Sequence, residues 1–315
     1  MRDTRFGVTL AFQAPESLRA LAIRAEALGF DSIWSGDHIA FHNPTLESLT
    51  TLSHLAAITR RVRIGTGVYL LALRHPTIAA KSVATLDVLS GGRFVFGVGV
   101  GGEFPKEFEA AGVPHHERGR RVDEAIAVCR LLWAKSPASF EGQFVRFTDV
   151  ALEPKPVQPG GPPIWIGGRS DHALRRAARL GDGWVSYVVT PERYRASLER
   201  IHAFAAEAGR DLRAGRRFEP AHLFFAVMDD DWDRARVQAA RYLTRQYNQP
   251  FDELVKKYCL LGPPAVCLET LARFVEAGVR TFIIGFVAGA DRAPEQLERF
   301  AAEVLPHFST SPSPA

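Results

Sequence analysis

Residues 77–99 of the chain have the sequence TIAAKSVATLDVLSGGRFVFGVG. The stretch 77–89 predicts a helix, Ser90-Gly91-Gly92 predicts a turn, and the apolar run 93–99 predicts a buried strand. A helix joined by a short turn to a buried strand is typical of chains that build a parallel sheet with helices on its faces.

The same unit recurs along the chain. Eight short apolar or β-branched runs alternate with amphipathic helical stretches, and the predicted strands lie at 6–11, 32–35, 62–68, 93–99, 163–166, 183–187, 222–228 and 280–285. This pattern predicts an α/β fold, a closed (β/α)8 TIM barrel. We expect one domain over residues 1–308 and a flexible Ser/Pro-rich tail at 309–315. Two insertions are expected, a hairpin at 140–152 after the fourth strand and extra helices at 231–277 after the seventh.

The composition excludes several classes of protein. The 315 residues are 46% hydrophobic and 23% charged, which excludes a disordered chain, a fibre and a small disulfide scaffold. Three cysteines, Cys129, Cys259 and Cys267, lack C-x-x-C spacing, which indicates a reducing compartment and argues against a thiolate zinc site. The N-terminus lacks the apolar segment of a secretion signal, and the longest nearly apolar run, 64–73, is too short to span a bilayer. We therefore expect a cytoplasmic protein without a membrane partner.

The balance of basic and acidic residues indicates whether the protein binds nucleic acid. The net charge is +4, from 39 basic and 35 acidic residues, and the arginines are interleaved with acids rather than gathered in a stripe. Nucleic-acid binding would require such a stripe with stacking aromatic residues. We expect a small-molecule substrate, no nucleic-acid partner and a homodimer.

The search for a site starts at the strand ends, because barrel enzymes act at the carboxyl ends of their strands. After the second strand stand Asp37 and His38, with His42 close behind. A carboxylate beside an imidazole can orient a substrate and move a proton at neutral pH, so both are candidate catalytic residues. The alternatives are a structural turn capped by Asp37 and, less favoured, a metal site that adds His42.

Glycines mark the next two strand ends. Thr66, Gly67 and Val68 follow the third strand, where a glycine allows either close packing or the approach of a flat ligand. The fourth strand ends in GVGVGGE, residues 97–103, which matches G-x-G-x-x-G. A dinucleotide site of the Rossmann type is disfavoured, because Pro105, Gly112 and Pro114 interrupt the helix that such a site requires. We instead expect Gly99 and Gly101 to let backbone approach a ring system, with Glu103 as a candidate acid or a solvated carboxylate.

The fifth strand is followed by Gly167, Gly168, Arg169 and Ser170, which lead directly into a helix. Free N–H groups, the positive end of the helix dipole and an arginine predict a phosphate site. The alternative is a glycine turn capped by Ser170 or Asp171. These strand ends together predict a barrel that binds a flat, phosphate-bearing cofactor.

The chain resembles the luciferase-like monooxygenase superfamily, the flavin- and deazaflavin-dependent barrels related to bacterial luciferase. Four stretches carry the resemblance: AEALGFDSIW (25–34) with Asp37-His38, ATLDVLSGGR (84–93), PPIWIGG (162–168) and ARLGDGW (178–184). The pair Asp37-His38 resembles the branch that uses coenzyme F420. There, the resemblance implies, the histidine lies beside the deazaflavin and gives or takes a proton during hydride transfer.

The resemblance also implies roles at the other strand ends. Thr66-Gly67-Val68 matches a segment with a non-prolyl cis peptide that supports the ring, and Gly167-Gly168 matches the family's phosphate-binding turn. In sugar-phosphate dehydrogenases of this branch a glutamate directly follows a single G-x-G. Here Gly102 intervenes and Glu103 comes one residue later, which argues against that substrate class.

Two alternatives stay open. The same barrel can use FMN and molecular oxygen as a monooxygenase, and some relatives are non-catalytic binding barrels. Retention of Asp37, His38 and the glycine turn favours an enzyme. Four aromatic residues near strand ends, which either line an apolar pocket or simply pack, are Trp34, Phe41, Trp184 and Tyr187.

Overall fold

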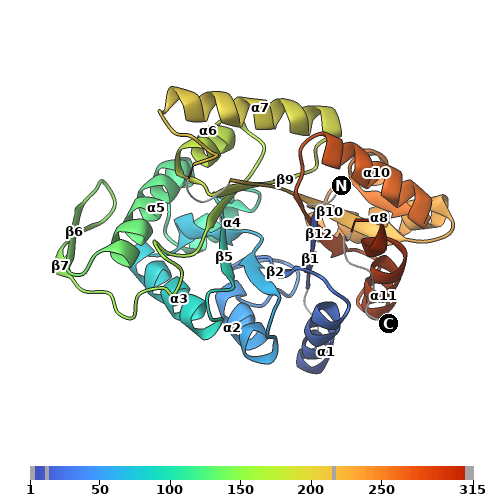
Figure 1. Cartoon of the computed structure of the whole chain (residues 1–315), viewed down its shortest axis with the longest axis horizontal. Coiled ribbons are helices and arrows are strands. Elements are labelled where there is room, and N and C mark those ends of the chain that lie inside the picture. The colour runs from blue at the N-terminus through green and yellow to red at the C-terminus, as the bar shows by residue number, and fades with distance from the viewer. Residues whose placement is uncertain (1–3, 11–13, 215–217, 309–315) are drawn as a thin grey trace.

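Eight parallel strands form a closed barrel in the computed structural model, which describes residues 4–10, 14–214 and 218–308 (Figure 1). The strands are β1 (Arg5–Thr9), β2 (Ser32–Ser35), β3 (Arg63–Thr66), β5 (Phe94–Gly99), β8 (Ile164–Gly167), β9 (Gly183–Tyr187), β10 (Glu219–Met228) and β12 (Thr281–Phe286). The barrel closes because β10 pairs with both β9 and β12, and β12 pairs with β1. The predicted (β/α)8 barrel is confirmed.

Helices surround the strands (Figure 1). They are α1 (Pro15–Ala27), α2 (Ser48–Ile58), α3 (Pro76–Leu89), α5 (Arg118–Ala134), α6 (Asp171–Leu180), α7 (Pro191–Glu207), α10 (Pro264–Glu276) and α11 (Ala293–Glu303). Local sequence sets several helix starts. Ser170 and Thr190 accept backbone N–H groups as N-caps, and prolines occupy the first turns of α1, α3 and α7.

Both predicted insertions are present. The antiparallel hairpin of β6 (Ala138–Glu141) and β7 (Arg146–Val150) projects from the barrel beside α5 (Figure 1). After β10 come α8 (Trp232–Tyr247), α9 (Asp252–Tyr258) and the short strand β11 (Leu260–Gly262), which pairs with the end of β10. The sequence patterns did not predict α4 (Pro105–Ala110) or the 3-10 turn His115–Glu117, because prolines and glycines interrupt the helical periodicity there.

Three strand bounds differ from prediction by two residues or more. The third strand ends at Thr66 rather than 68; the Gly67–Val68 peptide is cis, as the resemblance implied, and β4 (Tyr69–Leu70) then pairs with β5. The first strand ends at Thr9, and position 11 lies outside the described residues. The seventh strand begins at Glu219 instead of 222, because Glu219 and Pro220 already pair with β9.

Bulky aromatic rings fill the interior of the barrel. Trp34 and Trp165 lie on the axis with ring centroids 5.1 Å apart, surrounded by Val95, Val185, Ala221 and Ile283. The neighbouring strands carry glycine where these rings approach; a Cβ on Gly65 would come within 2.4 Å of the Trp34 ring. These rings occupy the barrel interior, which is consistent with ligand binding at the carboxyl ends of the strands.

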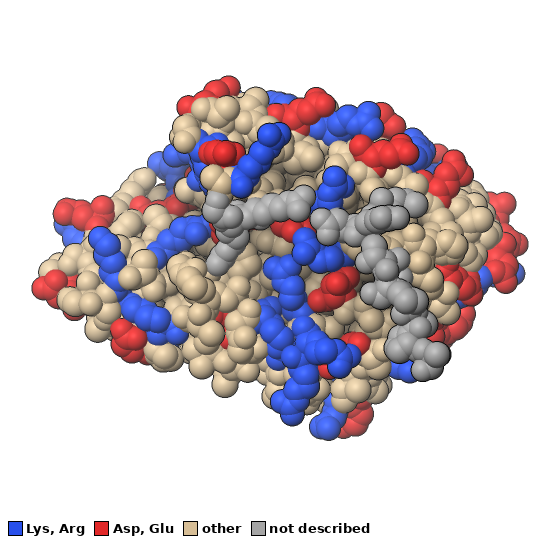
Figure 2. Space-filling model, viewed as in Figure 1, with Lys and Arg blue, Asp and Glu red and all other residues tan. Residues whose placement is uncertain are grey.

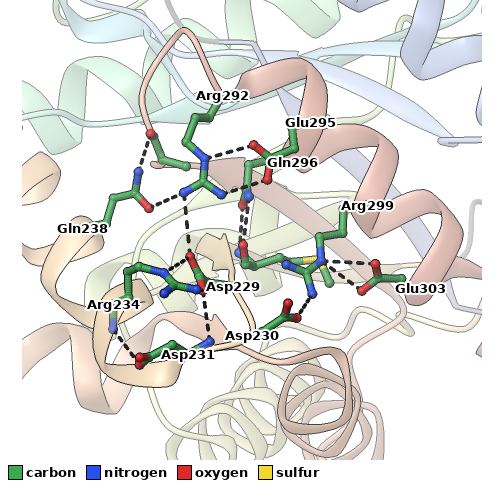
Figure 3. Close-up of polar contacts among 12 residues, drawn as sticks. Asp229, Asp230, Asp231, Arg234, Gln238, Arg292, Glu295, Gln296, Arg299 and Glu303 are labelled. Atoms are coloured by element: carbon green, nitrogen blue, oxygen red, sulfur yellow. Dashed lines mark hydrogen bonds and ion pairs between the residues drawn. The ribbon is translucent and has the colours of Figure 1, made fainter.

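A polar network fixes the insertion after β10 (Figure 3). The buried Gln296 side chain of α11 accepts the Met228 N–H at 2.8 Å and donates to the Met228 carbonyl at 2.9 Å. Asp229 accepts hydrogen bonds from Arg234 of α8, and Arg292 donates to Gln238 of α8 at 2.9 Å. Helices α8 and α11 are thus joined at the end of β10.

The surface carries side chains of both charges (Figure 2), and the cysteines form no disulfide bonds. Basic side chains form a band on the face shown in Figure 2, with acidic side chains among them. Within the described ranges no helix combines the length and the apolar character needed to cross a membrane. The three cysteines are free, and burial raises the pKa of each thiol to about 12.

Candidate active site

His38 is held in one orientation by a residue that the sequence patterns did not single out. Its Nδ1 lies 3.0 Å from Oε2 of Glu107, a buried residue of α4. The other carboxylate oxygen, Oε1, accepts the N–H groups of Ile39 at 2.7 Å and Ala40 at 3.2 Å. Since a carboxylate accepts, Nδ1 carries the proton, which leaves Nε2 as the basic nitrogen. Among the described residues Nε2 has no hydrogen-bond partner.

Asp37 lies beneath the mouth of the barrel rather than in it. Its side chain is fully buried, and Arg74 donates to both oxygens, at 2.6 and 2.8 Å. Ser48 Oγ and the Leu70 N–H donate as well, at 3.1 and 2.8 Å. The carboxylate is thereby saturated with donors and ties the loop after β2 to the segment after β4. Its geometry fits a structural support better than a proton shuttle.

Val68 fills the space that was predicted for close approach of backbone to a ring. Gly99 and Gly167 face the barrel interior, because they lie four residues after Val95 and two residues after Trp165, on the same faces of their strands. A Cβ on Gly99 would lie 2.4 Å from Val68 Cγ2, and one on Gly167 would lie 2.7 Å from Val68 Cγ1. The glycines therefore admit the Val68 side chain. A ring at the mouth would contact half-buried Val68 instead of bare backbone.

Thr66 and Gly101 have structural surroundings. Thr66 is buried and donates its hydroxyl to the Gly97 carbonyl at 2.7 Å. Gly101 has φ +64°, and a Cβ there would meet Leu70 and Phe108 at 3.3 and 3.4 Å.

Two buried nitrogen atoms near Gly102 have no acceptor. Arg118 Nη1 donates to the His115 carbonyl at 2.8 Å and lies 3.3 Å from His115 Nδ1. Within the described chain, Arg118 Nε and His115 Nε2 are buried without a hydrogen-bond partner. Both lie 3.0 Å from where a Cβ of residue 102 would stand, and Gly102 has φ +117°. Since Nδ1 faces the Arg118 donor, Nε2 carries the proton, so two N–H donors point at the glycine turn.

The turn after β8 leads into the N-terminus of α6, as the sequence predicted. Gly168 has φ +131°, its N–H donates to the Val185 carbonyl, and its carbonyl accepts Trp184 Nε1 at 2.7 Å. Ser170 caps α6, and Arg169 is exposed, with Nη1 3.1 Å from the Val188 carbonyl. Helix α5 starts nearby, because Arg176 of α6 donates to the Gly119 carbonyl at 3.1 Å. The residues present fit a bound phosphate: a helix N-terminus, the exposed Arg169 and the two unpaired donors near Gly102.

Glu103 is tied to the opposite side of the mouth. Tyr187 lies two residues after the interior-facing Val185, on the same face of β9, and donates its hydroxyl to Glu103 Oε1 at 2.7 Å. Burial, followed by the negative charge of Glu103, raises the pKa of Tyr187 well above its usual value. Tyr187 therefore stays protonated, and Glu103 is an acceptor already in use.

The aromatic residues named from sequence divide into two groups. Phe41 and Tyr187 lie near the mouth, whereas Trp34 fills the barrel. Trp184 points outward and packs on Tyr194 with ring centroids 4.8 Å apart. His42 contacts the Arg245 carbonyl instead of completing a metal set with Asp37 and His38. The described residues hold no group of three His, Cys, Asp or Glu side chains able to bind a metal.

A barrel with an oriented imidazole and a helix N-terminus at the carboxyl ends of its strands fits an enzyme that acts with a phosphate-bearing cofactor. The chain matches the family described as luciferase-like monooxygenase over residues 4–281. The chain therefore belongs to the luciferase-like monooxygenase family and is an oxidoreductase.

Its relatives use either of two cofactors. An F420-dependent glucose-6-phosphate dehydrogenase of Kineococcus radiotolerans is 27% identical, over 93% of this chain and 93% of that protein. An FMNH(2)-dependent dimethylsulfone monooxygenase of Pseudomonas putida is 29% identical, over 82% of this chain and 78% of that protein. The solved structure of the coenzyme F420 dependent tetrahydromethanopterin reductase from Methanopyrus kandleri superposes with a TM-score of 0.82 at 22% identity, covering 98% of this chain and 100% of that one. The likeness to the Methanopyrus kandleri structure, at 22% identity, supports the barrel fold alone.

Proposed function

We propose that the protein is a coenzyme F420-dependent oxidoreductase that transfers hydride to or from a small organic substrate. The observation that carries this proposal is the His38–Glu107 pair. It leaves a basic nitrogen, Nε2, free of protein partners at the end of β2. Hydride transfer at a hydroxyl or carbonyl carbon needs a group that moves one proton, and a held imidazole meets that need.

The cofactor is held through its phosphate in this account. The turn Gly167–Ser170, Arg169 and the N–H groups of His115 and Arg118 supply donors for one anionic group. Val68 supports the ring. When bound, the deazaflavin supplies the hydride acceptor or donor.

Each residue near the mouth then has a role. His38 Nε2 takes a proton from the substrate, or returns it in the reverse direction. Glu107 holds the imidazole and its tautomer, as a buried carboxylate does in other proton-transfer pairs. Asp37 is a positioning residue, because Arg74 occupies both of its oxygens.

The second candidate is an FMN-dependent monooxygenase, which the likeness to the Pseudomonas putida enzyme supports. The turn 167–170 serves FMN equally well. The oriented proton-transfer pair favours hydride chemistry, since that reaction requires a proton partner for the substrate.

Replacement of His38 tests the role of the imidazole. His38→Ala should lower the rate of hydride transfer, followed through the absorbance of F420 with an alcohol that the wild type oxidises, by about 10²-fold or more. F420 affinity should change little, because the phosphate donors are untouched. Unchanged turnover in His38→Ala would remove His38 from the mechanism.

A further inference from the structure

Four rings from two loops pack together beside the free nitrogen of His38. His38 stacks on Phe41 with centroids 4.1 Å apart and planes 9° apart, and Phe104 meets Phe41 edge-on at 4.5 Å. His42 lies 4.3 Å from Phe41 and 5.7 Å from Phe104. We refer to His38, Phe41, His42 and Phe104 as the ring group. Phe41 and Phe104 are only half-buried, so part of their carbon surface faces outward.

The ring group rests on the end of α8, which brings further rings near. His42 Nε2 lies 3.4 Å from the Arg245 carbonyl, and Asn43 donates to Gln246 Oε1 at 3.1 Å. The next residue, Tyr247, stacks on Phe251 at 5.3 Å. Burial, and then the negative charge of Glu103, raises the pKa of Tyr247, which places Tyr247 near Glu103. The phenols of Tyr187 and Tyr247 therefore both stay neutral at physiological pH.

The charges around this surface are unsuited to an anionic substrate. Arg74 is bound to Asp37, and the Arg169 head lies over the Tyr187 ring at 5.2 Å, beside the turn assigned to the cofactor phosphate. The carboxylates are Glu107, which is buried, and Glu103, which is exposed. A substrate phosphate or carboxylate packed between these rings would lose hydration beside the Glu103 carboxylate.

We infer that the substrate is an uncharged, hydrocarbon-rich molecule with one hydroxyl or carbonyl group, held by Phe41 and Phe104 against His38. This inference rests on the proposed hydride-transfer function. In the oxidative direction the substrate carbon gives a hydride to the cofactor and the hydroxyl gives its proton to His38 Nε2, which forms the carbonyl product. When bound, the deazaflavin would accept the hydride together with one proton from solvent, which balances the two electrons and two protons that leave the alcohol.

Ligand-observed NMR tests this inference without turnover. The probes are cyclohexanone and glucose 6-phosphate, added separately to the protein with and without F420. Saturation transfer to cyclohexanone is expected, and none to glucose 6-phosphate. Phe104→Ala should weaken cyclohexanone binding by about tenfold, the loss expected for one ring contact, while Phe104→Leu restores most of it. The matched control is Phe147→Ala, since Phe147 is a half-buried ring of the distant hairpin.

Two results would overturn the inference: glucose 6-phosphate binding in place of cyclohexanone, or cyclohexanone binding that Phe104→Ala leaves unchanged while circular dichroism shows a folded variant. Failure of the cofactor proposal looks different. In that case the protein fails to bind F420, while the cyclohexanone signal and its dependence on Phe104 persist.

Discussion

Glu107 decides which nitrogen of His38 carries the proton. In Glu107→Gln the amide NH2 would stand where Oε2 now faces Nδ1, while the amide oxygen would still accept from Ile39 and Ala40. A donor at that place favours the opposite tautomer, with the proton on Nε2. We expect hydride transfer to fall about 10²-fold.

Nitrogen-15 NMR of the histidine side chains measures the tautomer directly. The wild type should show His38 protonated at Nδ1, and Glu107→Gln should show it protonated at Nε2. The control is Glu109→Gln, because Glu109 is exposed and, among the described residues, its side chain pairs with Lys106 alone. Equal spectra and equal rates in all three proteins would mean that Glu107 does not set the tautomer.

His222 makes stability depend on pH. It is fully buried on the outer side of the barrel wall, and burial lowers its pKa from 6.5 to about 3. Below about pH 6.5 the unfolded chain binds a proton on His222, whereas the folded protein binds that proton only below about pH 3. Acid therefore lowers the free energy of unfolding. The contribution is lost at about 1.4 kcal/mol per pH unit within that window.

Urea unfolding of the wild type and of His222→Asn checks this slope. Asparagine keeps a polar partner for Ser186, whose hydroxyl lies 2.7 Å from His222 Nδ1, but it does not titrate. The variant should lose stability less steeply as the pH falls from about 6.5. Parallel curves for the two proteins would contradict the assignment.

At the level of single residues, the sequence identified candidate residues that lie close together along the chain and missed interaction partners that lie far apart along it. Asp37-His38 and the turn 167–170 are local patterns, and both lie at strand ends as expected. Glu107 is 69 residues from His38, and Arg74 is 37 residues from Asp37. No local periodicity links such pairs, so only the folded chain could join them.

Among the elements, the glycine turn after β5 offers a test of the cofactor site. A Cβ at position 102 would lie 3.0 Å from Arg118 Nε and from His115 Nε2, the two donors assigned to the cofactor phosphate. Gly102→Ala should therefore weaken F420 binding by about tenfold or more, the loss expected for a charged hydrogen bond.

The matched control is Gly112→Ala. Gly112 also has positive φ, +64°, but a Cβ there would meet nothing within 4 Å. It should cost about 1 kcal/mol of stability through backbone strain and leave the affinity for F420 unchanged. Equal affinities in Gly102→Ala and Gly112→Ala would show that the turn plays no part in cofactor binding.

Sequence patterns predicted elements well where one periodicity dominates. All eight barrel strands and both insertions are present. Helix α4, which carries Glu107, was not predicted, because it is only six residues long and Pro105 and Gly112 flank it with signals that interrupt a helical pattern. The third strand was drawn two residues too long, because Gly67 and Val68 continue its apolar pattern although strand pairing ends at Thr66.

For the whole molecule, the homodimer stays a prediction. Helix α3 exposes apolar side chains that one chain leaves uncovered: Ile78 is 65% exposed and Leu89 61%. Burial of such a face between two copies is a common source of dimer stability. Sedimentation equilibrium should give twice the mass of the 34.7 kDa chain, and Ile78→Glu with Leu89→Glu should give the single-chain mass. A wild-type protein that sediments at 34.7 kDa would contradict the prediction.

The choice of cofactor is the central claim, and fluorescence titration tests it most directly. The purified protein is titrated separately with F420 and with FMN, following quenching of fluorescence. The account predicts F420 binding in the micromolar range without FMN binding. Binding of FMN without F420 would contradict it and would favour the monooxygenase.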